Sequence, residues 1–555
     1  MKKILPKYIF VVGGVISGVG KGITASSLGK ILQDAGVSVT AIKIDPYVNV
    51  DAGTMNPTEH GEVFVTKDGD ECDQDMGNYE RFLNVDLTRV NYMTTGRVYQ
   101  SVIEKERSLK YHGACVQVVP HIPMEIVERI EVAQRNANAE VTVIEIGGTV
   151  GEYENILFLE AARMLKLRHS ECVMFVMVSY LPTPSNIGEM KTKPTQHSVR
   201  TLNGSGIQPD IIIARSAEPL DEKRKEKLSF FCNVPKEQVI SAPDIESIYD
   251  IPLNFEKEGL VPLIAKLLHI KLPRKAPTVG SEWKKMVHTI HSAKDEVCIA
   301  IVGKYFETGA FTLTDSYISV IEAIKYSAYK EGKKPVIDWV NAMEFEKDPK
   351  SVSKLKSYHG VIVPGGFGSR GIEGKIMAIE YVRKNKIPYL GLCYGMQLAV
   401  VECARHLAHI KGATTREVDA KSTTCVIDIM DTQRELMKKE HYGGSMRLGT
   451  YEANLKRGSI ARALYGKDMI FERHRHRFEV ATTFIERLEA AGVVFSGVSP
   501  DGTLMEIMEL PKAIHPFFVG SQFHPEFQAR PLVPHPLFTG FIKAAVLYGK
   551  GKRKK

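Results

Sequence analysis

The sequence predicts an α/β fold of two domains, each a mostly parallel sheet covered by helices. Short apolar runs alternate with helical stretches, which is typical of parallel sheets with helical crossovers. A glycine-rich turn joins such a run to a helix near the N-terminus, and a second strand–turn–helix surrounds Cys393. A segment rich in proline and basic residues marks a boundary between the halves. The predicted division is 1–272, a linker 273–296, 297–549 and a basic tail 550–555.

Length, composition and net charge limit the kinds of protein that this chain can be. The 555 residues suggest two to four domains, at about 100–200 residues each. Hydrophobic residues make up 44% and charged residues 25%, as in ordinary soluble globular proteins. The formal charge is +8, of which five charges come from Lys550, Lys552, Arg553, Lys554 and Lys555. The remainder is close to balance, so no nucleic-acid partner is expected, and the tail is expected to be disordered.

Cysteine usage and hydropathy indicate a compartment. The eight cysteines show no C-x-x-C spacing, which argues against a structural zinc site or a disulfide framework. A reducing, cytoplasmic location fits best. The apolar run after Lys2 and Lys3 is glycine-rich and runs into Lys21, unlike a signal peptide. No apolar run approaches the ~20 residues that span a bilayer, so no membrane association is expected.

Five apolar runs of the first half are expected to be strands. Ligands of parallel α/β sheets sit at the carboxyl ends of the strands, so the residues that follow these runs are candidates for a site. The expected strands are 8–12, 37–42, 141–146, 173–178 and 210–214.

The turn at residues 13–24 has the strand–glycine loop–helix order that cradles phosphates. It departs from the standard G-x-x-x-x-G-K-[ST] pattern in two places. Val15 stands where the first glycine belongs, and Gly22 replaces the Ser or Thr that usually holds Mg²⁺. Lys21 remains to reach the outer phosphates. If a metal binds, carboxylates elsewhere must hold it; the alternative is a glycine-rich turn without a ligand.

Polar residues gather after the other strands. Asp75 and Glu145, the latter next to Gly147 and Gly148, suit Mg²⁺, which takes few protein oxygens beside phosphates and waters; the alternative is a solvated acidic loop. Lys43 faces a phosphate or lies on the surface. The string 191–196, with two lysines around a threonine, clamps a triphosphate or forms a solvated loop.

The second half centres on Cys393. A strand ends there, the thiol sits between Gly391 and Gly395, and a helix begins. Such a tight turn exposes the sulfur to a helix N-terminus, which favours the nucleophilic thiolate. Cys403 and Cys425 lack this context and are interpreted as inert, buried side chains.

A nucleophile needs a base and an oxyanion site. In an extended segment, residues i and i+2 point to the same side, so Glu526 can orient His524 and stabilise its imidazolium. The glycine-rich turn 364–368 follows the apolar run 360–363 and can direct amide donors inward, as an oxyanion requires.

Several strings together resemble the CTP synthase family. They are Ser17 to Lys21, Lys-Ile-Asp-Pro-Tyr at 43–47, His-Gly-Glu-Val-Phe-Val at 60–65, Glu-Ile-Gly-Gly-Thr-Val-Gly at 145–151 and Lys-Thr-Lys-Pro-Thr-Gln-His-Ser at 191–198. The resemblance runs from about Tyr8 to Pro252. It implies a phosphate-loop-like amidoligase domain that binds ATP and UTP.

The resemblance also implies site residues in this half. Asp75 and Glu145 hold Mg²⁺, and Lys21 acts in catalysis. The ATP site comprises Ser17, Gly18, Val19, Gly20, Lys21, Gly22, Ile23, Asp75, Arg215, Pro243, Asp244 and Ile245. The site for UTP and the feedback inhibitor CTP comprises Ser17, Lys43, Glu152, Tyr153, Glu154, Lys191, Thr192, Lys193, Pro194, Thr195, Gln196 and Lys227. At Glu152 the family usually has Asp, which puts the strength of CTP feedback in doubt.

The strings around Cys393, His524 and Gly366 resemble the class I glutamine amidotransferase domain, which is also the second half of the CTP synthase family. The implied glutamine-binding residues are Gly366, Tyr394, Gly395, Met396, Gln397, Glu417 and Arg477. The surroundings of Glu417 depart from the family's usual Asn-Ser-Thr-Glu pattern. The Arg-His-Arg-His-Arg string at 473–477 could otherwise be a nucleic-acid patch or a metal site.

Together the halves imply one reaction. ATP phosphorylates the 4-oxygen of UTP, and ammonia released from glutamine at Cys393 displaces phosphate to give CTP. By resemblance, ammonia passes Pro57, His60 and Val63, GTP activates glutamine hydrolysis, and residues 443–449 form a mobile lid. The resemblance also implies a homotetramer that shares its UTP sites. Assembly into filaments beside catalysis is left open.

Two alternatives remain. One is an amidoligase acting on a different acceptor, against which the string 191–196 argues. The other is a regulatory protein that polymerises without turnover, which the intact Cys393, His524 and Lys21 disfavour.

Overall fold

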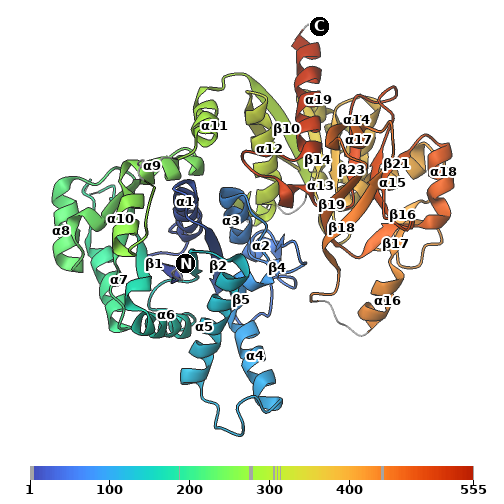
Figure 1. The fold of residues 1–555 in the computed structure, drawn as a ribbon. Coiled ribbons are helices and arrows are strands. Elements are labelled where there is room, and N and C mark those ends of the chain that lie inside the picture. The colour runs from blue at the N-terminus through green and yellow to red at the C-terminus, as the bar shows by residue number, and fades with distance from the viewer. Residues whose placement is uncertain are drawn as a thin grey trace. The chain divides into compact units, whose positions relative to one another are not determined.

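The chain packs into two units. The computed structural model describes residues 5–186, 188–273, 279–303, 307–308, 311–312, 314–438 and 443–553. The first unit comprises Met1–Asp51 and Asp75–Val287, and the second comprises Ala52–Gln74 and His288–Lys555 (Figure 1). Residues 52–74, expected within the first domain, therefore pack with the second unit. The predicted linker contains 274–278, which lie outside the described residues.

In the described residues of the first unit, seven strands form a parallel sheet in the order β5-β2-β6-β1-β7-β8-β9. All five expected strands are present, most of them longer than the apolar run. The strands are β1 (Lys7–Gly14), β2 (Val39–Asp45), β5 (Tyr92–Thr94), β6 (Val141–Ile146), β7 (Val173–Tyr180), β8 (Ile211–Ser216) and β9 (Val239–Pro243).

The central strand β1 is buried on both faces, as a parallel sheet covered by helices requires. Phe10 and Val12 join one apolar cluster with Ile144 and Phe175 of the neighbouring strands. Figure 1 shows α4 and α5 side by side, extending away from the sheet. The helices are α1 (Lys21–Asp34), α3 (Asp75–Leu83), α4 (Thr95–Arg107), α5 (Val118–Ala137), α6 (Ile156–Arg168), α7 (Lys193–Gly204), α8 (Glu222–Cys232), α9 (Ile251–Lys257) and α10 (Leu260–Leu267), followed by α11 (Ser281–Ser292).

The second unit is built on a mixed sheet. In its described part, nine strands follow the order β13-β10-β14-β15-β23-β22-β21-β18-β19. The pairs from β13 to β23 are parallel and those from β23 to β19 are antiparallel. The strands are β10 (Glu296–Gly303), β13 (Lys334–Asn341), β14 (Gly360–Val363), β15 (Tyr389–Leu392), β18 (Arg447–Leu455), β19 (Met469–His476), β21 (Val494–Val498), β22 (Met505–Glu509) and β23 (Phe518–Ser521).

Helices and short strands complete this unit. The short strands are β3 (Phe64–Val65), β4 (Glu71–Cys72), β11 (Glu307–Thr308), β12 (Phe311–Thr312), β16 (Thr414–Thr415), β17 (Cys425–Ile429) and β20 (Phe478–Val480). The helices are α2 (Pro57–His60), α12 (Ile318–Lys330), α13 (Ala342–Lys347), α14 (Ile372–Lys384), α15 (Tyr394–His406), α16 (Asp431–Lys438), α17 (Ile460–Tyr465), α18 (Ile485–Ala490) and α19 (Pro536–Arg553). The predicted α/β class, with two domains that are each built on a sheet covered by helices, is thus confirmed.

The basic C-terminal segment differs from the prediction. Helix α19 continues to Arg553, so Lys550, Lys552 and Arg553 belong to a helix rather than to a disordered tail. Lys552 donates hydrogen bonds to the carbonyls of Lys356 and Tyr358, which anchor the last turn. Residues 554–555 lie outside the described part.

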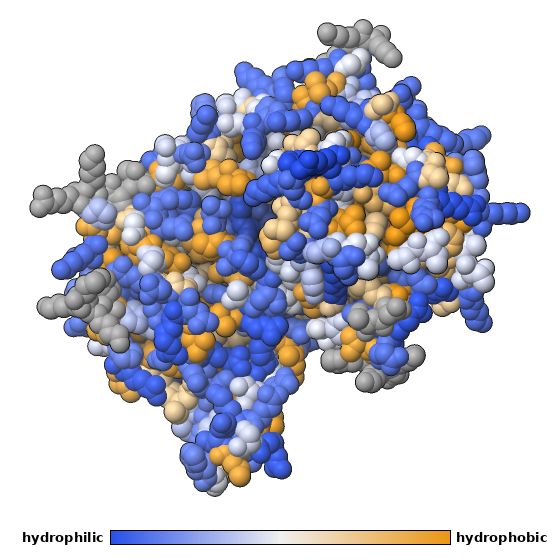
Figure 2. All heavy atoms as spheres, turned by 45° about the vertical axis from the view of Figure 1, so that its right-hand side comes forward, coloured by the Kyte–Doolittle hydropathy of each residue, from blue (hydrophilic) through white to orange (hydrophobic). Residues whose placement is uncertain are grey.

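Hydrophilic side chains cover most of the face that Figure 2 shows, with smaller hydrophobic areas between them. Among the described residues, no helix combines the length and apolar character that a membrane crossing requires.

Candidate functional site

The phosphate-loop turn of the first unit joins β1 to α1. Val15 has φ 77°, in the left-handed region, where the sequence pattern expects glycine. Valine takes this conformation only at a cost of about 1–3 kcal/mol. Val15 therefore holds a backbone conformation that glycine adopts more readily.

Lys21 lies against the start of this turn. Its Nζ donates to the Gly148 carbonyl at 2.9 Å. A Cβ built on Gly13 would lie 2.8 Å from Cδ of Lys21, so glycine makes room for the lysine. Burial lowers the pKa of Lys21, although Glu145 acts in the opposite direction.

Gly22 is explained by its neighbour Asp75, the first residue of α3. A Cβ on Gly22 would lie 2.2 Å from Asp75 Oδ1. The carboxylate therefore occupies the space that the Ser or Thr of a standard loop would fill. The loop lacks its hydroxyl because an acid from another element stands in the same place.

A second acid, Glu145, lies close by. Lys43 Nζ forms an ion pair with Asp75 and lies 3.4 Å from Asp45 Oδ1 and 3.6 Å from Glu145 Oε1. Tyr79 donates a hydrogen bond to Glu145. Lys43 is therefore not a surface residue, since it is 5% exposed.

The two acids titrate differently. Burial acts to raise the pKa of Asp75, but the charge of Lys43 and its hydrogen bond outweigh burial and lower the pKa. Burial, supported by the charge of Asp75, outweighs Lys43 at Glu145 and raises its pKa to about 7.

This donor set fits Mg²⁺. The carboxylates of Asp75 and Glu145 both lie within ion-pair distance of Lys43 Nζ, and Mg²⁺ in nucleotide sites takes one or two carboxylates with phosphates and waters. No group of three or more His, Cys, Asp or Glu side chains forms a metal site in the residues described, so an all-protein metal cage is not what these residues build.

Several residues of the predicted ATP site meet in one cavity. Its volume is about 200 Å³, and Gly20, Ile23, Arg215, Pro243, Asp244 and Ile245 line it. Arg215 binds Asp244 Oδ1 at 2.6 Å and the Val19 carbonyl at 3.3 Å. The structure thus brings together the loop and the β8 and β9 ends that the sequence placed in one site.

The predicted UTP-binding residues fall into two groups. Thr192, Thr195 and Gln196 are buried at the start of α7. A Cβ on Gly14 would lie 2.6 Å from Cβ of Ser198 in the same helix, so this helix packs against the phosphate loop. Lys191 pairs with Glu189 at 2.6 Å. Exposed residues of the predicted site are Ser17, Glu152, Tyr153, Glu154, Lys193 and Lys227.

In the second unit, Cys393 stands at the tight turn between β15 and α15. It has φ 49°, which is rare for a non-glycine residue and is typical of strained functional turns. A Cβ on Gly395 would lie 2.0 Å from the Val363 carbonyl, and one on Gly391 2.8 Å from the Gly395 backbone. Both glycines are therefore required for the turn, as predicted.

His524 and Glu526 form the expected pair. His524 Nδ1 lies 2.7 Å from Glu526 Oε1. Burial alone would lower the pKa of His524, but the charges of Glu526 and Cys393 outweigh it and raise the pKa to about 10.

The glycine turn closes the site over both groups. A Cβ on Gly365 would lie 3.0 Å from His524 Cε1 and 3.7 Å from Cys393 Cβ. A cavity of about 70 Å³ follows, lined by Gly365, Gly366, Phe367, Cys393 and His524. Gly366 is therefore placed beside the nucleophile.

The other predicted glutamine-binding residues differ in placement. Tyr394, Met396 and Gln397 are almost fully buried, Gln397 donates to Gln522 Oε1 at 3.1 Å, and none of the three is among the residues that line the cavity of Cys393. Glu417 accepts a hydrogen bond from the Gly368 amide at 2.5 Å.

Arg477 lies at the predicted lid. It binds Gln433 Oε1 at 2.7 Å and Ser445 Oγ at 3.1 Å. Ser445 belongs to 443–449, and the neighbouring 439–442 lie outside the described residues.

The 52–74 segment contributes to the same cavity. Pro57, Glu62 and Val63 line it together with Cys393 and His524. Two of the three predicted ammonia-passage residues are thus at the nucleophile. The third, His60, is not among the lining residues and has Nδ1 3.6 Å from Asp73 Oδ2.

Sequence reasoning missed several residues of this site. Glu62 accepts hydrogen bonds from Ser319 of the second unit, and Glu71 accepts one from Arg475 Nε at 2.8 Å. The sequence did offer one signal, the run of acids at 59–75. Acids on an exposed segment would not have the buried partners that Glu62 and Glu71 have. Its burial against basic residues depends on contacts between positions about 400 apart in the chain.

The Arg-His-Arg-His-Arg string is neither a nucleic-acid patch nor an exposed feature. Most of it belongs to β19, whose successive side chains point to opposite faces. Arg473, His474 and His476 are at most 2% exposed. Their burial corrects the alternative interpretation, since a nucleic-acid contact needs accessible cations.

Comparisons with known proteins identify the family of each half of the chain. The family model described as CTP synthase N-terminus matches residues 7–270, and that described as Glutamine amidotransferase class-I matches residues 312–544. The CTP synthase of Thermococcus gammatolerans is 51% identical over 543 residues, which cover 98% of this chain and 99% of that protein. The CTP synthases of Pyrococcus abyssi and Nostoc punctiforme are 50% and 48% identical over 99% and 98% of this chain, and over 99% and 97% of their own lengths. The chain therefore belongs to the CTP synthase family.

Proposed function

We propose a residue-level division of the reaction between the two units. The chain makes CTP from UTP, ATP and glutamine, as its full-length relatives named CTP synthase do. The first unit performs the ATP-dependent step and the second supplies nitrogen from glutamine. The two sites described above carry this division.

In the first unit, Lys21 and the loop amides neutralise the phosphates of ATP while a phosphoryl group moves to the 4-oxygen of UTP. Asp75 and Glu145 would hold Mg²⁺, which supplies further neutralisation of phosphate charge when bound. Lys43 keeps both carboxylates in place. Arg215 and residues 243–245 frame the adenine.

In the second unit, the Cys393 thiolate attacks the side-chain amide of glutamine. The amides of residues 365–367 stabilise the oxyanion, and His524 gives its proton to the departing ammonia. Glu526 holds the imidazole in the required orientation. Pro57 and Val63 lie where the ammonia is released, which supports a protected passage that starts in the 52–74 segment.

Regulation and assembly are inferred from family resemblance. We expect GTP to activate glutamine hydrolysis and CTP to inhibit through Glu152. The exposure of Tyr153, Glu154 and Lys227 is compatible with a UTP site completed by another subunit of a tetramer.

The observation that carries the synthetase assignment is that Asp75 fills the place of the missing loop hydroxyl. Asp75→Asn is therefore expected to raise the Mg²⁺ concentration for half-maximal CTP synthesis by about tenfold or more, since one charged metal ligand is lost. Manganese binding, followed by electron paramagnetic resonance in the presence of ATP, should weaken in parallel. The rate of glutamine hydrolysis, which the proposal assigns to the second unit, shows whether the Asp75→Asn protein is folded.

Asp86→Asn is the matched control, because Asp86 is exposed in the same unit. An unchanged metal requirement in Asp75→Asn would contradict the assignment, as would an equal loss in the control.

A further inference from the structure

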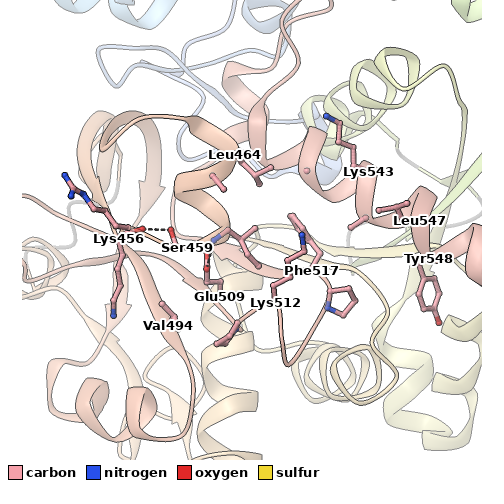
Figure 3. A pocket seen from close by; sticks show the side chains of 18 residues that line it. Lys456, Ser459, Leu464, Val494, Glu509, Lys512, Phe517, Lys543, Leu547 and Tyr548 are labelled. Carbon is pink, nitrogen blue, oxygen red and sulfur yellow. Dashed lines mark hydrogen bonds between the residues drawn. The ribbon is translucent and has the colours of Figure 1, made fainter.

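A larger hollow in the second unit shares no lining residue with the cavity of Cys393. Its volume is about 920 Å³, within the range of ~300–1,000 Å³ that holds small-molecule ligands. Figure 3 shows the side chains around it, which come from the turn 456–459, α17, the segment 511–517 and α19.

The walls of this hollow are mainly apolar. Leu464 of α17, Val494 of β21, Phe517 and Leu547 of α19 face it. Leu547 is 68% exposed, although it lies in the middle of a helix whose other apolar side chains are largely buried. A ligand with an apolar body would remove this surface from water, which is favourable.

The rim carries positive charge. Lys456, Arg457, Lys512 and Lys543 line the hollow. Lys543 lies 3.7 Å from Glu331 and Lys456 lies 3.9 Å from Glu489. Both pairs are largely exposed, and such pairs contribute little. Lys456 and Lys543 on the rim can therefore still bind an anion.

The acid among the lining residues does not neutralise this rim. Glu509 is 2% exposed, and its two oxygens accept the amide hydrogens of Ile460 and Ala461 at 2.7 and 3.1 Å. Its charge is thus committed to the start of α17. The cationic side chains around the apolar wall are therefore available to bind an anionic group of a ligand.

We propose that this cavity binds an amphipathic anion, an alkyl chain with one carboxylate or phosphate at its end. The chain would pack on Leu464, Phe517 and Leu547, and the head group would meet Lys512 and Lys543. The hollow is poor in the polar groups that recognise a nucleobase, so a nucleotide is not the expected ligand.

Calorimetric titration of the full chain with decanoate tests this proposal. We expect saturable binding of one decanoate per chain. Octanoate should bind about tenfold more weakly, because two methylenes fewer are buried. Decanol lacks the charge and acetate lacks the chain, so both should bind far more weakly than decanoate. Absence of saturable decanoate binding, or equal binding of decanol, would overturn the proposal.

Variants locate the site. Lys543→Glu and Leu547→Glu should each weaken decanoate binding by about tenfold or more, because one reverses a head-group contact and the other places a charge on the apolar wall. Lys550→Glu changes the same helix outside the hollow and should leave binding unchanged. Glutaminase activity of each variant confirms folding.

A second copy of the chain is the competing occupant. Sedimentation with and without Leu547→Glu distinguishes it, since an interface between copies would dissociate in the variant. Such dissociation without decanoate binding would overturn the ligand proposal.

The geometry also points to Glu71 as a positioning residue for glutamine hydrolysis. Glu71 is 2% exposed in β4 and holds Arg475 Nε at 2.8 Å. A Cβ on Gly53 would lie 2.2 Å from Glu71 Oε2, so glycine makes room for this carboxylate. The 52–74 segment is thereby locked to the catalytic half.

Arg475 connects Glu71 to the nucleophile. Its guanidinium lies 5.2 Å from the centre of the Phe367 ring in the oxyanion turn. Its carbonyl accepts the Cys393 thiol at 3.7 Å. Fixing Arg475 therefore fixes one wall of the 70 Å³ cavity. This inference rests on the proposed hydrolysis of glutamine at Cys393.

Glu71→Gln removes the charge but keeps the shape, and leaves Arg475 with a weaker partner in a buried site. We expect the kcat for glutamine hydrolysis to fall about tenfold or more, with partial recovery in Glu71→Asp. CTP formation from ammonium chloride should stay within about twofold. Glu59→Gln, an exposed acid of the same segment, should match the unchanged protein.

The outcomes separate the two claims. Unchanged glutaminase kcat in Glu71→Gln, or equal loss of the ammonia-dependent reaction, would overturn the positioning role alone. Loss of both reactions in Cys393→Ala would instead overturn the proposed division of labour.

Discussion

Cys393→Ala is expected to abolish CTP formation from glutamine and to preserve CTP formation from ammonium chloride. In the proposed division the thiol attacks glutamine, and removal of a nucleophile typically costs at least ~10³-fold in kcat. The phosphoryl step is assigned by the same proposal to Lys21, Asp75 and Glu145 in the other unit, which the substitution does not touch. CTP absorbance with each nitrogen source, and glutamate release, measure the two activities.

Cys115→Ala provides the matched control, because Cys115 is exposed and far along the chain from the site. It should behave as the unchanged protein in both assays. Residual glutamine-dependent CTP above about one per cent in Cys393→Ala would show that another group serves as nucleophile. A thermal melt of the variant excludes general unfolding as the cause of any loss.

Local patterns in the sequence predicted the parts of each site that adjacent residues build. The Cys393 turn is built from adjacent residues, and so is the His524–Glu526 pair. Within each of these two features, local backbone geometry relates the side chains. The carboxyl ends of parallel strands meet at one edge of the sheet, which is why the polar residues after these strands were grouped as candidates for one site, although a surface position was left open for Lys43.

Contacts across long sequence separations could not be predicted in the same way. Residues 52–74 interrupt the first unit yet pack against β19 of the second, with Arg473 donating to the Val65 carbonyl at 3.1 Å. Nothing in their local pattern distinguishes this from a surface loop of the first sheet. The basic end of α19 was misjudged for a related reason, since its anchor is the backbone near Lys356.

At Gly22 the sequence departs from the standard phosphate-loop motif, and the structure gives the reason for this departure. The pattern identified a missing hydroxyl, and the expected remedy was a carboxylate from elsewhere. The structure places Asp75 2.2 Å from a Cβ on Gly22. Glycine is therefore required at this position, whereas the standard motif has a side chain there.

Gly22→Ser, which completes the standard phosphate-loop motif, is accordingly expected to inactivate the synthetase reaction. The new side chain would force the Asp75 carboxylate to move by roughly 1 Å, and such a displacement of a catalytic group can cost ~100-fold in rate. CTP formation should fall by about this factor with glutamine and with ammonia alike. Glutamine hydrolysis, measured as glutamate release without UTP, should persist.

Gly204→Ser tests whether serine at a helix glycine of the same unit is harmful in itself. A Cβ at Gly204 meets no atom within 4 Å, so this variant should remain active. Full activity of Gly22→Ser would mean that a serine hydroxyl at the start of α1 can bind the metal and that Asp75 can move aside. The metal would then be bound as in a standard phosphate loop, and the role given to Asp75 would be wrong.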